Sequence, residues 1–232
     1  MKKINIFCFG FGQVAKNFIY NLNKTHDVNL ATTSRDKTQK KTIHGINYIS
    51  YHFIDESFDK EILKEIKNYD HILVSIPPKS GIDIVIKNFQ KTLEILKTNW
   101  ITYLSATSVY GDHNGEWVDE NSNLNPLTES GKSRLKAEKA WTSLAKKKNL
   151  PIQIFRLSGI YSKERNILVK IKSGSHQIIN KPNHFFSKTP PRAPFETPTR
   201  RFGATIQSQN SFRHAKIPPS LRNFQQIEEK NI

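Results

Sequence analysis

The feature that most constrains this sequence is a regular alternation of short apolar runs with helix-like patterns over residues 4–157. Strands joined through helices return parallel to one another, and apolar strands of this kind are buried on both faces of their sheet. The sequence therefore predicts an α/β fold with a doubly wound parallel sheet. We expect strands at 4–9, 28–32, 46–53, 71–76, 100–105 and 152–157, and helices at 13–23, 61–67, 83–97 and 132–148.

The first strand ends in a glycine turn, G-x-G-x-x-A, and a helical pattern follows at once. In this context Gly10 permits the tight turn, Gly12 lets the backbone approach a pyrophosphate, and Ala15 lets the helix pack closely on the sheet. The amides of the helix N-terminus then meet the phosphates. The pattern predicts a Rossmann-type dinucleotide site at Gly10, Phe11, Gly12, Gln13 and Val14. The alternative is that the glycines only close a turn.

The end of the second expected strand bears on the choice of cofactor. A site for NAD carries Asp or Glu there, to bind the ribose 2′-hydroxyl. This chain has Ser34 and Arg35 at that place, and a guanidinium suits a 2′-phosphate. The cofactor is therefore expected to be NADP or NAD, with NADP favoured. In the alternative interpretation Arg35 is a solvated loop residue and Asp36 approaches the ribose.

Several blocks occur in an order that is similar to the extended short-chain dehydrogenase/reductase superfamily, in its NAD-dependent epimerase/dehydratase group. The resemblance is to atypical members with a short glycine fingerprint, and it covers about residues 4–188. The blocks are the glycine turn, "SIPP" with Pro77 after the fourth strand, "SATSVYG", "VDENSNLNP" and "FRLSGIY". The resemblance implies dinucleotide binding, with Pro77 on the cofactor side, and oxidoreductase or epimerase chemistry on a small molecule.

In that family a Tyr and a Lys four residues later exchange the proton and hold the nicotinamide ribose, and a nearby Ser or Thr binds the substrate oxygen. Matching "SGKSRLKAE" to the family motif puts Ser130 in place of the Tyr and Arg134 in place of the Lys. The Ser/Thr position is Ala106, and Ser105 lies one residue away. Ser105, Ser130 and Arg134 are therefore the catalytic candidates. A serine hydroxyl is far less acidic than a phenol, so standard Tyr/Lys redox chemistry is not expected.

The substrate side is predicted from residues at strand ends. Arg156 and Tyr161 follow the sixth strand, at the sheet edge where substrates bind in such folds, and Tyr110 could turn into the same site. For these residues the alternative is an ordinary strand-end role. No metal site is expected, because the loop acids and histidine lack a spacing that fixes geometry. Those loop residues are Asp112, His113, Glu116, Asp119 and Glu120.

The sequence changes character near residue 189. Residues 1–188 are predicted to form the dinucleotide-binding domain with a partial, truncated substrate lobe. Residues 189–232 are rich in proline and have no sustained period, so they are expected to be an irregular or disordered tail. A frameshift, an inserted element or a truncated gene would each produce this departure from the family.

The chain carries 36 Lys and Arg against 20 Asp and Glu, a formal charge of +16. The lysines are scattered, so nucleic acid is not the expected partner. A single cysteine, Cys8, excludes an intramolecular disulfide, and no apolar run is long enough for a membrane span. A cytoplasmic location is expected. Three hypotheses stay open: an enzyme of this family, a non-catalytic dinucleotide sensor or scaffold, and a degraded gene product.

Overall fold

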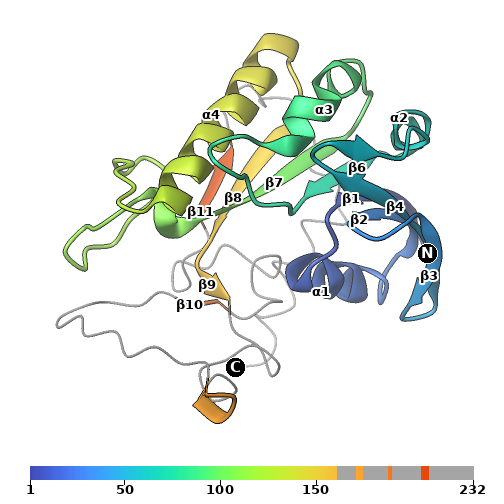
Figure 1. Cartoon of the computed structure of the whole chain (residues 1–232), viewed down its shortest axis with the longest axis horizontal. Helices are drawn as coiled ribbons and strands as arrows, with labels where there is room; N and C mark the ends of the chain where they lie inside the picture. The colour runs from blue at the N-terminus through green and yellow to red at the C-terminus, as the bar shows by residue number, and fades with distance from the viewer. Residues whose placement is uncertain (161–170, 175–187, 190–204, 209–232) are drawn as a thin grey trace.

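The computed structural model describes residues 1–160, 171–174, 188–189 and 205–208. A central mixed sheet carries helices on both faces (Figure 1). The strands are β1 (Lys3–Phe9), β2 (Asp27–Ser34), β3 (Gln39–Ile43), β4 (Ile46–Ile54), β5 (Ser57–Phe58), β6 (His71–Val74), β7 (Trp100–Ala106), β8 (Ile152–Leu157), β9 (Gly159–Ile160), β10 (Lys188–Thr189) and β11 (Thr205–Ser208). The helices are α1 (Gln13–Leu22), α2 (Ile62–Glu65), α3 (Ile84–Leu93) and α4 (Glu129–Lys148), with 3₁₀ turns η1 (Ile66–Asn68) and η2 (Thr107–Val109).

The parallel strands confirm the predicted Rossmann-type fold. In space they run β4-β2-β1-β6-β7-β8, and every neighbouring pair among them is parallel. The chain moves outward from β1 in one direction through β2 and β4, and in the other through β6, β7 and β8. The strand order therefore reverses beside β1, and ligands of doubly wound sheets bind outside the carboxyl ends of the strands at this point.

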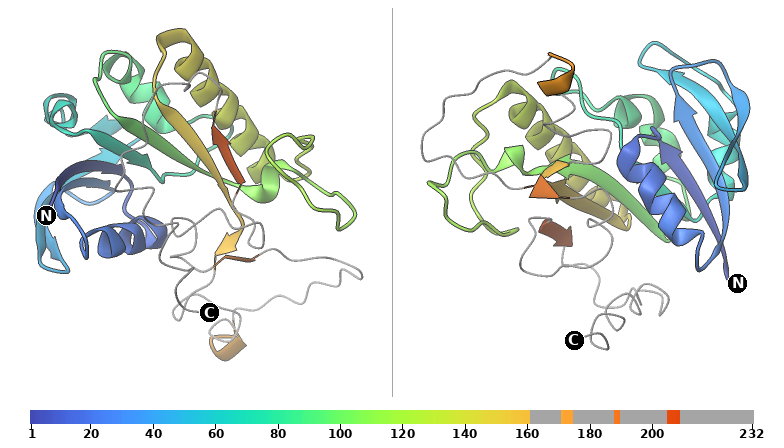
Figure 2. Two further views of the ribbon diagram at one scale, coloured as in Figure 1. Left: turned by 180° about the vertical axis from the view of Figure 1, so that it is seen from behind. Right: turned by 90° about the horizontal axis from the view of Figure 1, so that it is seen from below.

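The two faces of the sheet bury separate sets of side chains. Helix α1 covers one face, and α3 and α4 cover the other (Figures 1 and 2). Along β1, Ile6 and Cys8 pack with α1, whereas Phe7 and Phe9 pack with α3. This alternation on a strand that is apolar throughout is what burial on both faces requires.

The sequence interpretation missed β3 and the short strands β5, β9, β10 and β11. β3 contains Lys and Thr residues and no apolar run, yet it pairs antiparallel with β4. The connection is the two-residue turn His44-Gly45, with φ of 48° and 79°. Positive φ at both residues is the geometry of a type I′ hairpin turn, whose usual sequence signal is Asn-Gly. The hairpin therefore replaces a helical crossover between β2 and β4.

Helix α4 begins three residues earlier than predicted, at Glu129. The Thr128 hydroxyl caps it by accepting a hydrogen bond from the Gly131 amide at 3.0 Å. A Cβ on Gly131 would lie 2.5 Å from the Ser108 carbonyl oxygen, so this glycine lets α4 pack directly against η2. The early start brings residues 129–131 onto the helix.

Two short strands lie in the described parts of the C-terminal segment. Residues 205–208 form β11, which pairs antiparallel with β8 at the edge of the sheet. The pair Lys188–Thr189 aligns with β9 and spans the boundary predicted between 188 and 189. The rest of the predicted tail, and most of the predicted substrate lobe, lies outside the described residues. The domain boundary therefore stays a prediction.

A buried carboxylate joins α3 to α4. Asp83 caps α3, and its Oδ1 accepts hydrogen bonds from the amides of Val85 and Ile86 at 2.9 and 3.0 Å. Its Oδ2 accepts from the indole Nε1 of Trp141 on α4 at 2.9 Å. Burial raises the pKa of Asp83, and these three hydrogen bonds oppose the rise.

Asp83→Asn should therefore lower the free energy of unfolding by roughly 1–3 kcal/mol, because the amide cannot accept from both the helix N-terminus and Trp141. Urea unfolding followed by far-UV circular dichroism measures the loss. Trp141→Phe removes the indole donor, so the double variant should lose less than the sum of the single variants. Strict additivity would mean that Asp83 and Trp141 are not coupled.

Candidate functional site

Gly10 is required by the backbone and by packing. Its φ is +77°, and its amide donates to the Thr33 hydroxyl at 2.8 Å. A Cβ there would lie 2.8 Å from Ile76 Cγ1 and 2.9 Å from Ser75 Oγ. The turn after β1 is thus fixed between the end of β2 and the segment that follows β6. Thr33 lies with Ser34 and Arg35 at the strand end predicted to meet the ribose, but its hydrogen bond to the glycine turn was not predicted.

Gly12 has no such structural requirement. It is the N-cap of α1 with an ordinary extended conformation, φ −78° and ψ −174°. A Cβ at Gly12 would meet no atom of the described residues within 4 Å. The first turn of α1 has no acidic residue, and Gly12 supplies no side-chain cap. The helix therefore supplies neither a side-chain cap nor an acidic neighbour for its first-turn amides, which are the groups that bind an anion at a helix N-terminus.

The other predicted residues of the turn divide into two groups. Gln13 and Val14 begin α1, so their amides belong to its unpaired first turn. The Phe11 ring packs edge-on against Tyr48 of β4, with centroids 5.5 Å apart, which anchors the turn to the sheet. Pro77 is exposed in the segment after β6, and that segment joins the turn through the Ser75 amide and the Phe9 carbonyl at 2.9 Å.

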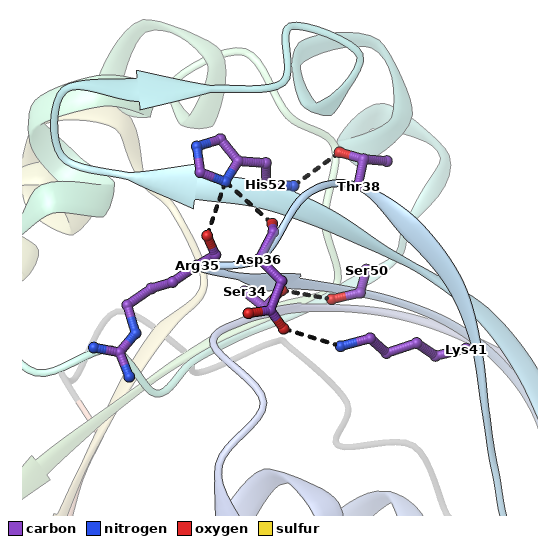
Figure 3. A network of polar contacts seen from close by, with 7 residues as sticks. All are labelled: Ser34, Arg35, Asp36, Thr38, Lys41, Ser50 and His52. Carbon is purple, nitrogen blue, oxygen red and sulfur yellow. Dashed lines mark hydrogen bonds and ion pairs between the residues drawn. The ribbon is translucent and has the colours of Figure 1, made fainter.

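After the end of β2, the side chains of Arg35 and Asp36 point in different directions (Figure 3). Asp36 pairs with Lys41 of β3 at 3.3 Å, whereas the Arg35 side chain is exposed and extends away from that pair. The Ser34 hydroxyl accepts a hydrogen bond from Ser50 at 3.1 Å. This arrangement disfavours the alternative in which Asp36 serves the ribose.

The three predicted catalytic residues do not converge. Ser130 is exposed on the first turn of α4, where it borders an open hollow of about 830 Å³ with Pro78 and Lys79. Arg134 lies one turn further and donates from Nη1 to the Leu104 carbonyl at 3.3 Å. Ser105 follows Leu104 and is buried, and its Oγ has no partner within the described part of the chain. The structure thus brings Arg134 to β7 beside Ser105, and leaves Ser130 apart.

Tyr103, whose phenol interacts electrostatically with Arg134, does not replace the missing tyrosine. Tyr103 lies two residues before Ser105 on β7 and is fully buried against Trp141, with ring centroids 5.8 Å apart. Burial raises the pKa of Tyr103 well above the usual value, and the Arg134 guanidinium only partly opposes the rise. Tyr103 therefore stays protonated and inaccessible at neutral pH.

Two predicted substrate residues are placed inside the protein. Arg156 and Tyr110 are 1% and 2% exposed. Arg156 donates from Nη2 and Nε to Glu138 Oε2 at 2.8 and 3.2 Å, and from Nη1 to the Tyr110 hydroxyl at 3.1 Å. Its guanidinium also lies over the Tyr110 ring, 4.9 Å from the centroid. The cluster favours a structural role over the substrate contact that the strand-end position predicted. Tyr161 lies outside the described residues.

The buried pair joins two of the sequence blocks in space. Glu138 comes from "SGKSRLKAE" on α4, and Arg156 from "FRLSGIY" on β8. Burial lowers the pKa of Arg156, but Glu138 and Tyr110 raise it above its usual value. The guanidinium is therefore permanently charged. Its hydrogen bonds to Glu138 join α4 to β8 of the sheet.

The loop before α4 carries no arrangement for a metal. Where the structure describes the chain, no group of three or more His, Cys, Asp or Glu side chains is placed to hold one. Asp119 instead accepts hydrogen bonds from Asn121 and Ser122 within its own turn, at 2.9 Å each. No described helix is long and apolar enough to cross a membrane.

No family model matches the sequence, and no curated protein matches it significantly. Solved structures do match. A functionally unknown conserved protein from Silicibacter pomeroyi is 26% identical with a TM-score of 0.59, over 81% of this chain and 64% of that one. A UDP-N-acetylglucosamine 4-epimerase from Methanobrevibacter ruminantium is 15% identical with a TM-score of 0.66, over 83% and 70%.

A UDP-glucuronic acid 4-epimerase from Bacillus cereus, solved with UDP-glucuronic acid and NAD, is also 15% identical, with a TM-score of 0.64 over 86% of this chain and 76% of that one. The chain thus spans less than two thirds of the length of the Silicibacter protein and somewhat more of the two epimerases. The chain shares the fold of the NAD-dependent epimerases and dehydratases, which confirms the resemblance that its motifs indicate.

Proposed function

We propose that this chain binds a nicotinamide dinucleotide, NADP or NAD, across the N-terminus of α1, and that it lacks the Tyr/Lys proton relay of the family that its motifs resemble. The observation that carries the proposal is Gly12. Neither its backbone angles nor its surroundings require a glycine. A ligand whose phosphates approach the first turn of α1 does require one.

The surrounding fold supports the same assignment. The turn lies beside β1, where the strand order reverses, and Gly10 ties it to β2 and to the segment after β6. A dinucleotide spans such a reversal, with one half on each side. Solved neighbours of this fold include epimerases described in complex with NAD.

The proposed absence of the relay rests on the chemistry at α4. A bound dinucleotide supplies hydride transfer at its nicotinamide ring, and the protein must then supply or remove a proton. The Ser130 hydroxyl is a far weaker acid than a phenol, and a guanidinium such as that of Arg134 does not serve as a proton donor. Tyr103 is buried and protonated. These properties favour a dinucleotide sensor or scaffold over an oxidoreductase or epimerase.

The enzyme hypothesis remains the second candidate, because Ser105 carries a hydroxyl close to the backbone that Arg134 binds. A substrate in that case would be a small molecule. UDP-sugars are the natural panel, since they occur in the solved complexes of the structural neighbours.

Calorimetric titration of the full chain with NADP⁺, NADPH, NAD⁺ and NADH tests the binding proposal. We expect saturable one-site binding of at least one of them, and about 2.7 kcal/mol of added stability at a ligand concentration of 100 Kd. No heat and no change in Tm at high excess of all four ligands would overturn it.

Turnover is tested separately, by absorbance at the reduced nicotinamide band with a panel of carbonyl compounds and by chromatography of UDP-sugars. We expect neither hydride transfer nor epimerisation by a chain that binds the cofactor. Any turnover that is lost in the Ser105→Ala variant would reject the non-catalytic function and assign the chemistry to Ser105.

A further inference from the structure

The β3–β4 hairpin lies beside the end of β2, where the adenosine ribose of a dinucleotide is recognised in doubly wound sheets. β3 contributes Lys41, and β4 contributes Ser50 and His52 (Figure 3). The hairpin was not predicted from the sequence, so these three residues were not among the predicted site residues. The side chain of each of them contacts one or two of residues 34–36.

Lys41 changes what Asp36 can do. Its Nζ lies 3.3 Å from Asp36 Oδ2, and the Asp36 side chain is still 65% exposed. A free carboxylate at this place would accept hydrogen bonds from a ribose and would repel a 2′-phosphate. The pairing compensates that negative charge. In the β3–β4 register, Lys41 pairs with Tyr48 and Lys40 pairs with Ile49. This register therefore determines which of the two lysines lies next to Asp36.

His52 holds the backbone from which Arg35 projects. Its Nδ1 lies 3.1 Å from the carbonyl oxygens of both Arg35 and Asp36. Carbonyl oxygens only accept, so Nδ1 carries the proton and donates to them. The His52 amide donates to the Thr38 hydroxyl at 2.9 Å, and Thr38 donates to Asp59 at 2.7 Å. The loop between β2 and β3 is therefore tied to β4 at both ends.

Arg35 is left as an exposed cation at the end of β2. Its side chain extends away from the Asp36–Lys41 pair (Figure 3). Within the described ranges, no carboxylate forms an ion pair with its guanidinium. A guanidinium held on a fixed backbone suits bidentate binding of a phosphate.

We propose that the β3–β4 hairpin makes the dinucleotide site selective for a 2′-phosphorylated ribose, and so for NADP over NAD. Arg35 binds the phosphate, Lys41 neutralises Asp36, and His52 is a positioning residue that fixes residues 35 and 36. This inference rests on the dinucleotide site proposed above. It assigns selectivity to Lys41 and His52 in addition to the strand-end arginine.

The test is calorimetric titration of the full chain with NADP⁺ and NAD⁺, and with adenosine 2′,5′-bisphosphate and AMP as the matching fragments. We expect NADP⁺ to bind at least about tenfold more tightly than NAD⁺, and the bisphosphate to retain that preference. Arg35→Ala should weaken NADP⁺ about ten- to hundredfold and leave NAD⁺ nearly unchanged.

Lys41→Ala exposes the Asp36 charge, so it should weaken NADP⁺ and strengthen NAD⁺. Lys40→Ala is the matched control, because Lys40 is a neighbouring exposed lysine of β3 that forms no ion pair in the described residues. Adding Asp36→Asn to Lys41→Ala should restore the NADP⁺ preference. If Lys40→Ala and Lys41→Ala lose NADP⁺ affinity equally, Lys41 contributes only as one of the positive charges of the surface. That result would reject its assigned role.

His52→Ala should lower the NADP⁺ to NAD⁺ preference, and His52→Asn, which keeps a donor, should recover part of it. Circular dichroism melting confirms that each variant is folded. If NAD⁺ binds as tightly as NADP⁺, or if Arg35→Ala weakens both equally, the selectivity inference is overturned while the proposed function stands. If neither cofactor binds, the proposed function fails.

Discussion

Glu138→Ala should lower the free energy of unfolding by roughly 3–5 kcal/mol, the cost expected when a buried charge loses its counter-ion. Glu138 and Arg156 have side chains that are only 3% and 1% exposed, and three hydrogen bonds of 2.8 to 3.2 Å join them. The variant removes these three hydrogen bonds from the Arg156 guanidinium, and the hydrogen bond from Arg156 to the Tyr110 hydroxyl is kept. Urea unfolding, followed by the fluorescence of the buried Trp141, measures the loss.

Two further variants separate the buried pair from general effects of charge removal. The double variant Glu138→Ala/Arg156→Met removes both charges and should be more stable than Glu138→Ala alone. Lys64→Ala breaks an exposed pair with Glu61 and should leave the urea midpoint nearly unchanged. If Glu138→Ala unfolds at the midpoint of the parent chain, the pair does not lock α4 to the sheet.

The direction of the Arg156 side chain could not be predicted, because β8 is buried on both faces and its sequence shows no alternation. In the structure Arg156 is in register with Ser105 of β7, and it faces α4 together with Ile154. One sequence signal could have identified its partner. Glu138 occupies the buried face of α4, with Ala137, Trp141 and Leu144. A carboxylate among apolar helix positions requires a buried cation or donor.

The parts predicted correctly depend on local signals. The run β1–turn–α1 combines an apolar strand, glycines at fixed positions and a helical period, so its structure follows from neighbouring residues. β3 lacks such a signal, since its strand conformation comes from pairing with β4 across the His44-Gly45 turn. The residues that control the end of β2, Lys41 and His52, were missed for the same reason. Their role depends on hairpin register, which no single segment encodes.

Gly12→Asp should abolish dinucleotide binding and leave the protein folded. Aspartate is a preferred N-cap residue, and a Cβ at Gly12 meets no atom of the described residues within 4 Å, so the substitution should if anything strengthen α1. The new carboxylate, however, accepts hydrogen bonds from the first-turn amides of α1 and places a negative charge where the pyrophosphate is proposed to bind. We expect calorimetry to show that the Kd of the dinucleotide rises by more than about a hundredfold, which corresponds to a loss of roughly 3 kcal/mol of binding free energy.

Comparison with two other variants distinguishes loss of the site from loss of the fold. Gly12→Asn also caps the helix but adds no charge, so it should weaken binding less than Gly12→Asp. Gly10→Ala forces a Cβ to within 2.8 Å of Ile76 at a φ of +77°, so it should lower Tm even without ligand. Gly12→Asp should instead keep the Tm of the parent chain and lose only the increase that the dinucleotide produces. A Gly12→Asp chain that still binds with parental affinity would show that the first turn of α1 does not hold the phosphates.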